Sequence, residues 1–313
     1  MRMFALLKET VREWSEDGAS RLAAALAYYT TFSLAPLLVL IIAIAGLIGG
    51  QEAAQSQTMA QVQDLLGPQG GEFVQSMIEN ASRPATGVTA TIIGVVTLLF
   101  GALGVFGELQ NSLNTIWEVK PKPAQGLFDS LKRFVIDRLL SFTMVLGIGF
   151  LLLASLVISA VLSALGNYIG NALPMADLWL QLINFVISFV VVTALFAMIF
   201  KFLPEVDIAW KDVWLGAAVT SLLFSLGKFL IGFYLGRSTV GNTFGAAGSL
   251  AILLIWVYYS AQILFFGAEF TQVYANRYGS KIVPDPDMVK VTEQERAEKG
   301  IPHRETMKKQ MGE

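Results

Sequence analysis

Six uninterrupted apolar runs constrain this sequence more than any other feature. Each run is at least 21 residues long, and at a rise of about 1.5 Å per residue such a helix crosses a hydrocarbon core of about 30 Å. A transmembrane barrel would instead show strands of about ten residues with alternating polarity. The sequence therefore predicts an all-α polytopic membrane protein with six transmembrane helices, at residues 22–48, 87–107, 139–165, 178–203, 213–235 and 245–269.

The composition excludes several other classes of protein. Of the 313 residues, 54% are hydrophobic and 15% are charged, whereas soluble domains carry about 25% charged residues. The chain has no cysteine and a single histidine, His303, which argues against disulfide frameworks, zinc sites and histidine-based catalysis. The net charge of −2 argues against a nucleic-acid partner.

Sequence signatures of enzymes are also missing. The pair Gly227-Lys228 lies inside an apolar run and lacks the glycine spacing of a phosphate-binding loop, and no GxSxG, HExxH or EF-hand motif occurs. We therefore expect no catalytic residue, no cofactor and no metal site. Any transport by this chain is expected to be passive or coupled to an ion gradient, unless a separate motor subunit supplies the energy.

The distribution of Lys and Arg predicts the orientation of the spans. Four of these residues precede the first span, five lie between the second and third spans, and eight follow the last span. The connections on the opposite side offer only Arg83 and Arg237. Because basic residues favour the cytoplasmic side, both termini are predicted to be cytoplasmic.

Three segments outside the spans have recognisable patterns. Residues 1–21 carry Phe4, Leu7, Val11 and Trp14 at helical spacing, which predicts a cytoplasmic amphipathic helix that lies on the membrane surface or packs on the spans. Residues 51–84 predict an external amphipathic helical hairpin, either a lid or an interfacial element. Residues 272–313 hold eight basic and seven acidic residues, which predicts a solvated cytoplasmic tail.

One basic residue inside a span is a candidate substrate contact. Lys228 lies in the outward half of the fifth span and shares a polar face with Ser225, and a charge in a span is costly unless it faces a cavity or a partner. Arg237 follows nine residues later, about 13.5 Å along a helix, so the two bases could accommodate an anionic headgroup. A structural ion pair or a snorkelled lysine is the alternative.

Acids and bases at the cytoplasmic ends of the spans predict a charged layer. Glu108 and Glu269 end the second and sixth spans, and Arg138 and Lys201 lie at the ends of the third and fourth. They are interpreted as an ion-pair network that locks or gates the bundle, or as a site where an acid couples transport to a proton or ion. In the sixth span Tyr259, Gln262 and Glu269 share one stripe, a candidate polar lining.

Several motifs, in order, resemble the YihY/BrkB family of bacterial inner-membrane proteins. They are AAALAYYTTFSLAP at 23–36, FGELQNSLNTIW at 106–117, Leu203-Pro204, GRSTVG at 236–241, GAAGS at 245–249, WVYY at 256–259 and GAEFT at 267–271. The resemblance covers residues 10 to 280 and implies six spans in the cytoplasmic membrane of a bacterium. Family members have been described as ribonuclease BN-like, as serum-resistance virulence factors and as movers of envelope lipids or solutes.

The resemblance supplies no catalytic residue. It carries over Asn111, Asn114, Arg237, Tyr259, Gln262 and Glu269 only as structural or cavity positions. The leading hypothesis is a transporter or lipid translocator for an anionic or amphiphilic envelope molecule, with membrane lipids as partners and room for oligomerisation. The competing hypothesis is a non-transporting membrane scaffold or envelope-integrity protein, and a membrane nuclease is disfavoured because the metal and water of hydrolysis would have no ligands.

Overall fold

The computed structural model describes residues 2–82, 104–123, 176–237, 246–280 and 282–298, together with Gly126, Thr143 and Gly147. Four described helices are long and apolar enough to cross a membrane. They are α2 (Ala19–Gly49), α6 (Ala176–Phe202), α7 (Trp210–Arg237) and α9 (Ala246–Arg277), and they match four of the six predicted spans. The spans predicted at 87–107 and 139–165 lie almost entirely outside the described residues.

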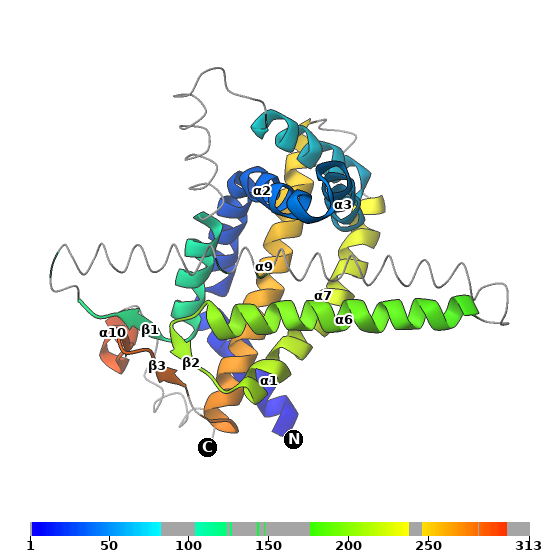
Figure 1. Cartoon of the computed structure of the whole chain (residues 1–313). Helices are drawn as coiled ribbons and strands as arrows, with labels where there is room; N and C mark the ends of the chain where they lie inside the picture. The colour runs from blue at the N-terminus through cyan, green and yellow to red at the C-terminus, as the bar shows by residue number, and fades with distance from the viewer. Residues whose placement is uncertain are drawn as a thin grey trace.

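Helix α9 is the centre of the described fold. It packs against α1 (Arg2–Glu16), α2, α3 (Gln51–Ala81) and α7, and Figure 1 shows it running through the middle of the molecule. Its side chains Phe265 and Ala268 are completely buried in the main apolar cluster with Phe200 of α6 and Val213 of α7. Helices α1, α2 and α7, which contribute to the candidate sites, are therefore all positioned against α9.

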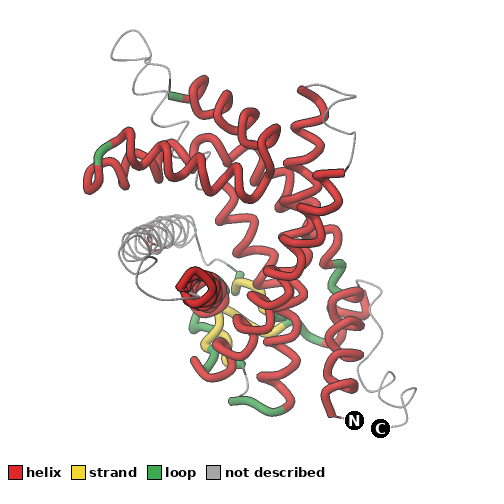
Figure 2. Tube along the Cα trace, turned by 90° about the vertical axis from the view of Figure 1, so that its right-hand side faces the viewer, coloured by secondary structure: helices red, strands yellow, loops and turns green. Residues whose placement is uncertain are grey.

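Helix α6 crosses its neighbours instead of running beside them. Figure 1 shows it lying across α7 and α9, and Figure 2 shows it nearly end-on. The crossing is held by aromatic contacts, with the ring centroids of Phe196 and Phe224 5.7 Å apart. Its exposed side chains Phe185, Val186 and Val190 are apolar, as expected from the composition of the run that predicted it.

Two glycine–threonine contacts bring α7 and α9 close together. A β-carbon at Gly216 would overlap Thr271, and a β-carbon at Gly267 would overlap Thr220. Both threonines are completely buried and donate their hydroxyls to backbone carbonyls of their own helices. Small residues at these positions let the helix backbones approach, which supplies packing energy where no hydrophobic drive exists in lipid.

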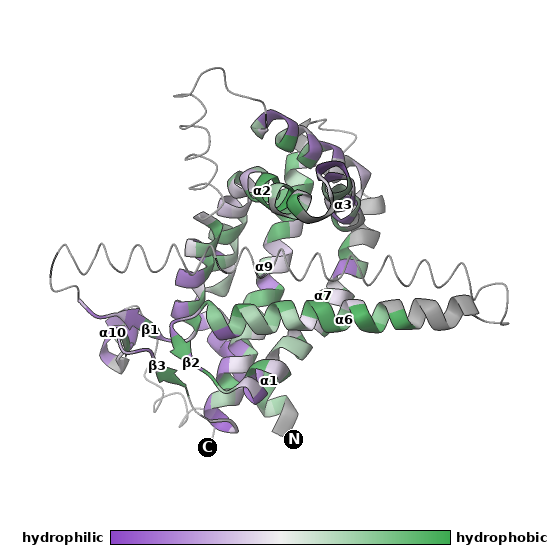
Figure 3. Cartoon of the chain, in the orientation of Figure 1, coloured by the Kyte–Doolittle hydropathy of each residue, from purple (hydrophilic) through white to green (hydrophobic). Residues whose placement is uncertain are grey.

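Helix α1 packs on α9, one of the two placements expected from the sequence. Its buried face carries Leu6, Thr10 and Glu13, and Leu6 contacts Phe270 and Val273 of α9. Of the predicted apolar stripe, Phe4, Leu7 and Val11 are exposed, whereas Trp14 is half-buried and packs against the main apolar cluster. Figure 3 shows α1 with mixed polarity. The helical conformation is then interrupted at Gly18, which has a φ of 65°, before α2 begins.

Helix α3 corresponds to the segment predicted as a helical hairpin. It is interrupted at Gly67, where φ is 75° and ψ is 175°, and Pro68 follows. Both halves contribute to a second apolar cluster with α2, through Met59, Leu66 and Val74. In Figure 1 this segment lies at the end of the fold opposite the chain termini, and its placement outside the membrane stays a prediction.

Residues 282–298 of the tail are not the solvated arm that the charges of the tail predicted. Strand β1 (Val119–Pro121) pairs antiparallel with β4 (Met288–Lys290), and β2 (Val206–Asp207) pairs with β3 (Val283–Pro284). The short helix α10 (Glu293–Glu298) follows. Ile282 and Met288 are buried in the main apolar cluster. Arg296 is buried because its ion pairs replace the contacts with water that a guanidinium otherwise needs.

Candidate functional site

A cluster of buried acids lies where α1 ends against α9. Glu13 is 4% exposed, Asp17 is 8% exposed and Glu269 is completely buried, and Glu16 is half-buried beside them. The amide of Asp17 donates to the carbonyl of Glu13 at 2.9 Å as the last turn of α1 closes, and Gly18 then turns the chain. Asp17 thus sits at a helix C-terminus, where a negative charge is unfavourable.

Two arginines partly balance these acids. Arg296 of α10 is 2% exposed, and its Nη2 lies 3.4 Å from Glu16 Oε2 and 3.5 Å from Glu13 Oε2, while its Nη1 pairs with Glu118 Oε1. Arg12 pairs with Glu13 at 2.9 Å and with Glu16 at 3.5 Å. The two guanidinium groups therefore face Glu13, Glu16 and Glu118, and the described ion pairs do not include Asp17 or Glu269.

Asp17 and Glu269 form the uncompensated part of the cluster. Burial raises the pKa of Asp17 from 3.8 to about 7; Arg296 opposes this increase, and the negative charges of Glu13 and Glu16 add to it. The Glu269 carboxyl interacts directly with that of Asp17. Neither oxygen of Glu269 meets a hydrogen-bond donor among the described residues, which is exceptional for a buried carboxyl.

A polar cavity of about 920 Å³ opens beside the cluster. Its walls include Asp17 directly after α1, Arg21 of α2, Asn111 and Thr115 of the helix at 104–116, and Arg296 of the tail. The lining mixes acids, bases, amides and a hydroxyl, so the cavity suits water and polar groups of either charge. The predicted position Asn111 faces this cavity.

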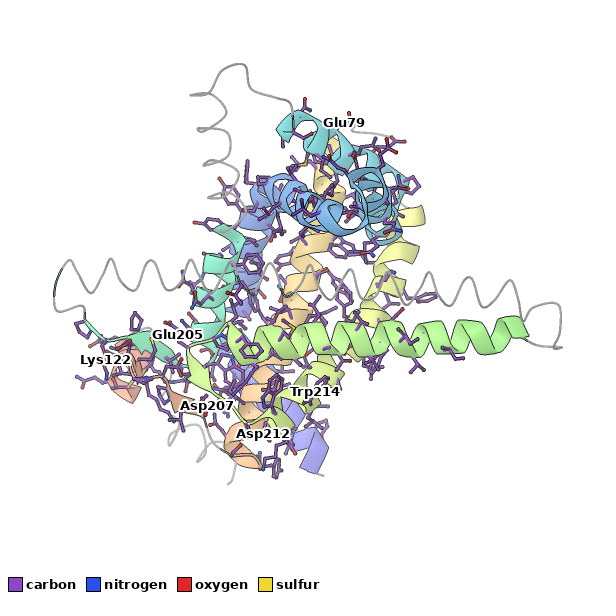
Figure 4. The ribbon with its side chains drawn as sticks, viewed as in Figure 1. Glu79, Lys122, Glu205, Asp207, Asp212 and Trp214 are labelled. Carbon is purple, nitrogen blue, oxygen red and sulfur yellow. The ribbon has the colours of Figure 1, made fainter. Side chains whose placement is uncertain are left out.

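Asn114 ties the helix at 104–116 to the turn after α6. Its Nδ2 donates to Glu205 Oε2 at 2.7 Å, and its Oδ1 accepts from the Glu205 amide at 2.9 Å. Figure 4 labels Glu205 in this turn, next to Asp207. Asn114 is buried and, although it also lines the cavity, both ends of its amide are used in this contact.

The charged layer predicted at the span ends has different partners in the structure. Lys201 Nζ lies 2.6 Å from Asp207 Oδ1 and donates to the carbonyl of Ile208 at 2.7 Å, and no described ion pair joins it to Glu108 or Glu269. The turn after α6 brings Asp207 back to Lys201, whereas Glu269 faces α1. Glu108 is half-buried, and Arg138 lies outside the described residues.

A separate cleft between α7 and α9 brings together two of the predicted substrate contacts. Its volume is about 290 Å³, and its walls include Trp14, Leu226, Gly227, Tyr259 and Gln262. The walls are mostly apolar, yet the amide oxygen of Gln262 is shielded and meets no donor among the described residues. Gly227 permits the contact, since a β-carbon there would lie 2.5 Å from the Tyr259 hydroxyl.

The other predicted substrate residues are not in this cleft. Lys228 is half-buried and lines none of the described cavities. The hydroxyl of Ser225 donates to the Ser221 carbonyl at 2.8 Å. Arg237 ends α7, and its side chain lies outside what the structure describes.

Sequence reasoning missed Asp17, Glu118 and Arg296 as site residues. A signal existed for the first of these, because Glu13, Glu16 and Asp17 follow one another at helical spacing directly before an apolar span and a glycine. Glu118 gave no such signal, because its positive φ of 54° is visible only in the structure. The short helix that carries Arg296 had a local signal, but the partners of Arg296 did not, because they are more than 170 residues away in sequence.

Comparison with known proteins agrees with the motifs. The family model described as "Virulence factor BrkB" matches residues 10–291. The chain is 26% identical to a UPF0761 membrane protein of Alcanivorax borkumensis over 83% of this chain and 58% of that protein. It is 28% identical to one of Halorhodospira halophila, over 84% and 55%, and 27% identical to one of Teredinibacter turnerae, over 91% and 64%. The chain thus spans less than two thirds of the length of these relatives, and no solved structure matches it significantly.

Proposed function

Since the chain belongs to the BrkB family of membrane proteins, we propose that it is a transporter or lipid translocator for an amphiphilic envelope molecule. We place it in the cytoplasmic membrane of a bacterium with both termini in the cytoplasm, following the distribution of Lys and Arg. Membrane lipids are its partners in this proposal, and no catalytic step is assigned to it.

The observation that carries the proposal is the cleft between α7 and α9. Leu226, Leu230 and Phe266 offer apolar walls suited to acyl chain, and Gln262 offers an amide oxygen that lacks a donor among the described residues. A pocket that is mostly apolar with a few polar groups is typical of ligand sites. An amphiphile that donates one hydrogen bond near the start of its chain would satisfy both features.

The charge of the substrate is a separate part of the proposal. Lys228 follows Gly227 on α7, but its side chain is not among the residues that line the cleft. We include it in the proposal as a base near the cleft that would favour an anionic headgroup. The cleft volume of about 290 Å³ is too small for a whole phospholipid, so it would hold only part of one at a time.

Transport is tested with the purified full chain in liposomes that contain a fluorescent NBD-phospholipid and are exposed to dithionite, which bleaches only the outer leaflet. We expect the protein to increase the bleached fraction, more for NBD-phosphatidylglycerol than for NBD-phosphatidylcholine. Gln262→Leu should reduce the rate, whereas Ser260→Ala, on the same helix but outside the cleft, should not. Bleaching equal to that of protein-free liposomes for both lipids would refute translocation of phospholipids.

A scaffold function is the second candidate, and a specific observation favours it. The glycine–threonine contacts between α7 and α9 and the tail that reaches across to α1 join distant parts of the chain. Such cross-links suit a rigid body that holds other envelope proteins. An envelope phenotype that survives Gln262→Leu but is lost with Arg296→Met would support this function over transport.

A further inference from the structure

We propose that Asp17 and Glu269 form a proton-binding site, in which two facing carboxyls share one proton that the chain takes up from the polar cavity beside Asp17. Proton binding itself does not depend on any transport activity. Its use as the coupling ion of transport rests on the function proposed above.

The geometry of Glu269 is the first argument. The side chain is completely buried, and neither carboxyl oxygen meets a hydrogen-bond donor among the described residues. It faces the carboxyl of Asp17, which is 8% exposed. Two ionised carboxylates at such a site repel each other, and a shared proton both supplies the missing donor and removes one charge.

The surroundings of the pair are the second argument. From α1, Glu13 and Glu16 add negative charge, and Arg12 pairs with both of them. From the tail, Arg296 pairs with the same two acids and with Glu118. Helix α7 also packs on α9 near Glu269, and the α7 residues at this contact, Gly216 and Thr220, do not titrate. The described ion pairs of Arg12 and Arg296 thus go to Glu13, Glu16 and Glu118. From α2, Arg21 lines the cavity beside Asp17, but no described ion pair joins it to Asp17 or Glu269, so these two carboxyls carry the unpaired negative charge.

A proton fits this site better than a metal ion. The described residues contain no group of three or more acids arranged to hold a metal, and metal ions in oxygen sites require several converging ligands. A proton needs only the two oxygens that the pair provides. Burial, which raises the pKa of Asp17, favours the same protonated form.

The position of Asp17 provides a path for the proton. Asp17 and Glu16 line the 920 Å³ cavity, while Glu269 lies behind Asp17 in the protein. A proton from water therefore reaches Asp17 first and is shared with Glu269. Loss of the proton would leave two negative charges facing each other where the end of α1 meets α9, next to the turn at Gly18. Their repulsion would weaken the packing of α1 on α9.

The test is an infrared pH titration of the full chain in nanodiscs without added substrate. Wild type should show the carbonyl stretch of a protonated carboxyl that disappears with a midpoint near neutral pH. Glu269→Gln and Asp17→Asn should each remove this titrating band. Glu79→Gln, at an exposed position labelled in Figure 4, should leave it unchanged. A wild type without such a band, or a band that persists in both site variants, would overturn the proposal.

Thermal unfolding at several pH values gives a second readout that needs no assignment of bands. The melting temperature of wild type should fall as the pH rises from 5 to 8, and Glu269→Gln should flatten this dependence because the amide supplies the donor at every pH. An equal slope in wild type and Glu269→Gln would count against the site. In liposomes that transport lipid, the same variant should lose the dependence on a pH gradient, whereas absence of transport would leave the infrared result standing and refute only the proposed function.

Discussion

Replacing Arg296 by methionine should destabilise the protein more than any other single change in its tail. The guanidinium is buried, with 3% of the side chain exposed, and it contacts Glu13, Glu16 and Glu118, whose side chains are 6%, 16% and 15% exposed. Removing one partner of a buried ion pair costs about 3–5 kcal/mol, because the remaining charge stays buried. Glu13 and Glu16 keep Arg12 as a partner, so we expect the lower end, about 3 kcal/mol.

The assay is thermal unfolding of the full chain in detergent, followed by size-exclusion chromatography after heating. With an unfolding entropy of about 2.1 cal/mol/K per residue, a loss of about 3 kcal/mol corresponds to a decrease of about 5 °C in the melting temperature of a 313-residue chain. Lys290→Met is the matched control, because Lys290 lies in the same tail and is exposed. Lys120→Met, which removes a pair with side chains 43% and 33% exposed, should cost less than about 1 kcal/mol.

Neutralising an acid should restore part of the lost stability. In the double variant Arg296→Met with Glu118→Gln, one buried negative charge disappears, so the double variant should be more stable than Arg296→Met alone. Lower pH should act in the same direction by protonating the acids. The reasoning is refuted if Arg296→Met melts like wild type, or if neither Glu118→Gln nor acid pH recovers any of the loss.

Three further predictions concern other parts of the site and the fold. The pKa of Asp17 is about 7 in the folded chain against an ordinary 3.8, so the folded state binds more protons than the unfolded state between these values. The free energy of unfolding should therefore fall as the pH rises from 4 to 7, by at most about 4 kcal/mol. In thermal melts at pH 4 to 8, Asp17→Asn should lose this pH dependence. Asn114→Asp should cost about 1–3 kcal/mol, since it loses its donor and repels Glu205, whereas equal melting would show that this hydrogen-bonded contact contributes little. Gly267→Ala should cost about 1–3 kcal/mol through overlap with Thr220. Adding Thr220→Gly should recover part of this stability, and no recovery in the double variant would contradict a steric origin of the loss.

The helices followed from the sequence because the bilayer imposes a length on apolar runs. The run predicted at 22–48 became α2, Ala19–Gly49, and that at 213–235 became α7, Trp210–Arg237. Helix α9 continues to Arg277, eight residues beyond the predicted end at 269. The apolar run ends at Glu269, but Phe270, Thr271 and Val273 are buried. Packing against neighbouring elements therefore stabilises the helix beyond the end of the apolar run.

The arrangement of the site did not follow from the sequence, because depth alone does not specify a neighbour. Glu269 and Lys201 were placed in one layer by their positions at span ends, yet Lys201 found Asp207 six residues away. Glu269 instead faces Asp17, 252 residues earlier in the chain. Gln262 and Tyr259 were predicted to share a stripe, and they do line one cleft, because their spacing on a single helix is a local property that needs no knowledge of partners.

Local signals in the tail could have corrected its interpretation as a solvated arm. Thr292 and Glu295 form a capping box, in which the Thr292 amide donates to Glu295 Oε2 at 3.1 Å and the Glu295 amide donates to Thr292 Oγ1 at 3.3 Å, and this T-x-x-E pattern is readable in sequence. The helix it starts, α10, has only six residues, far too few to be stable alone in water. A capped helix of this length must therefore pack against another part of the chain. Arg296, directly after the capping box, makes this contact through its ion pairs with Glu13 and Glu16 of α1.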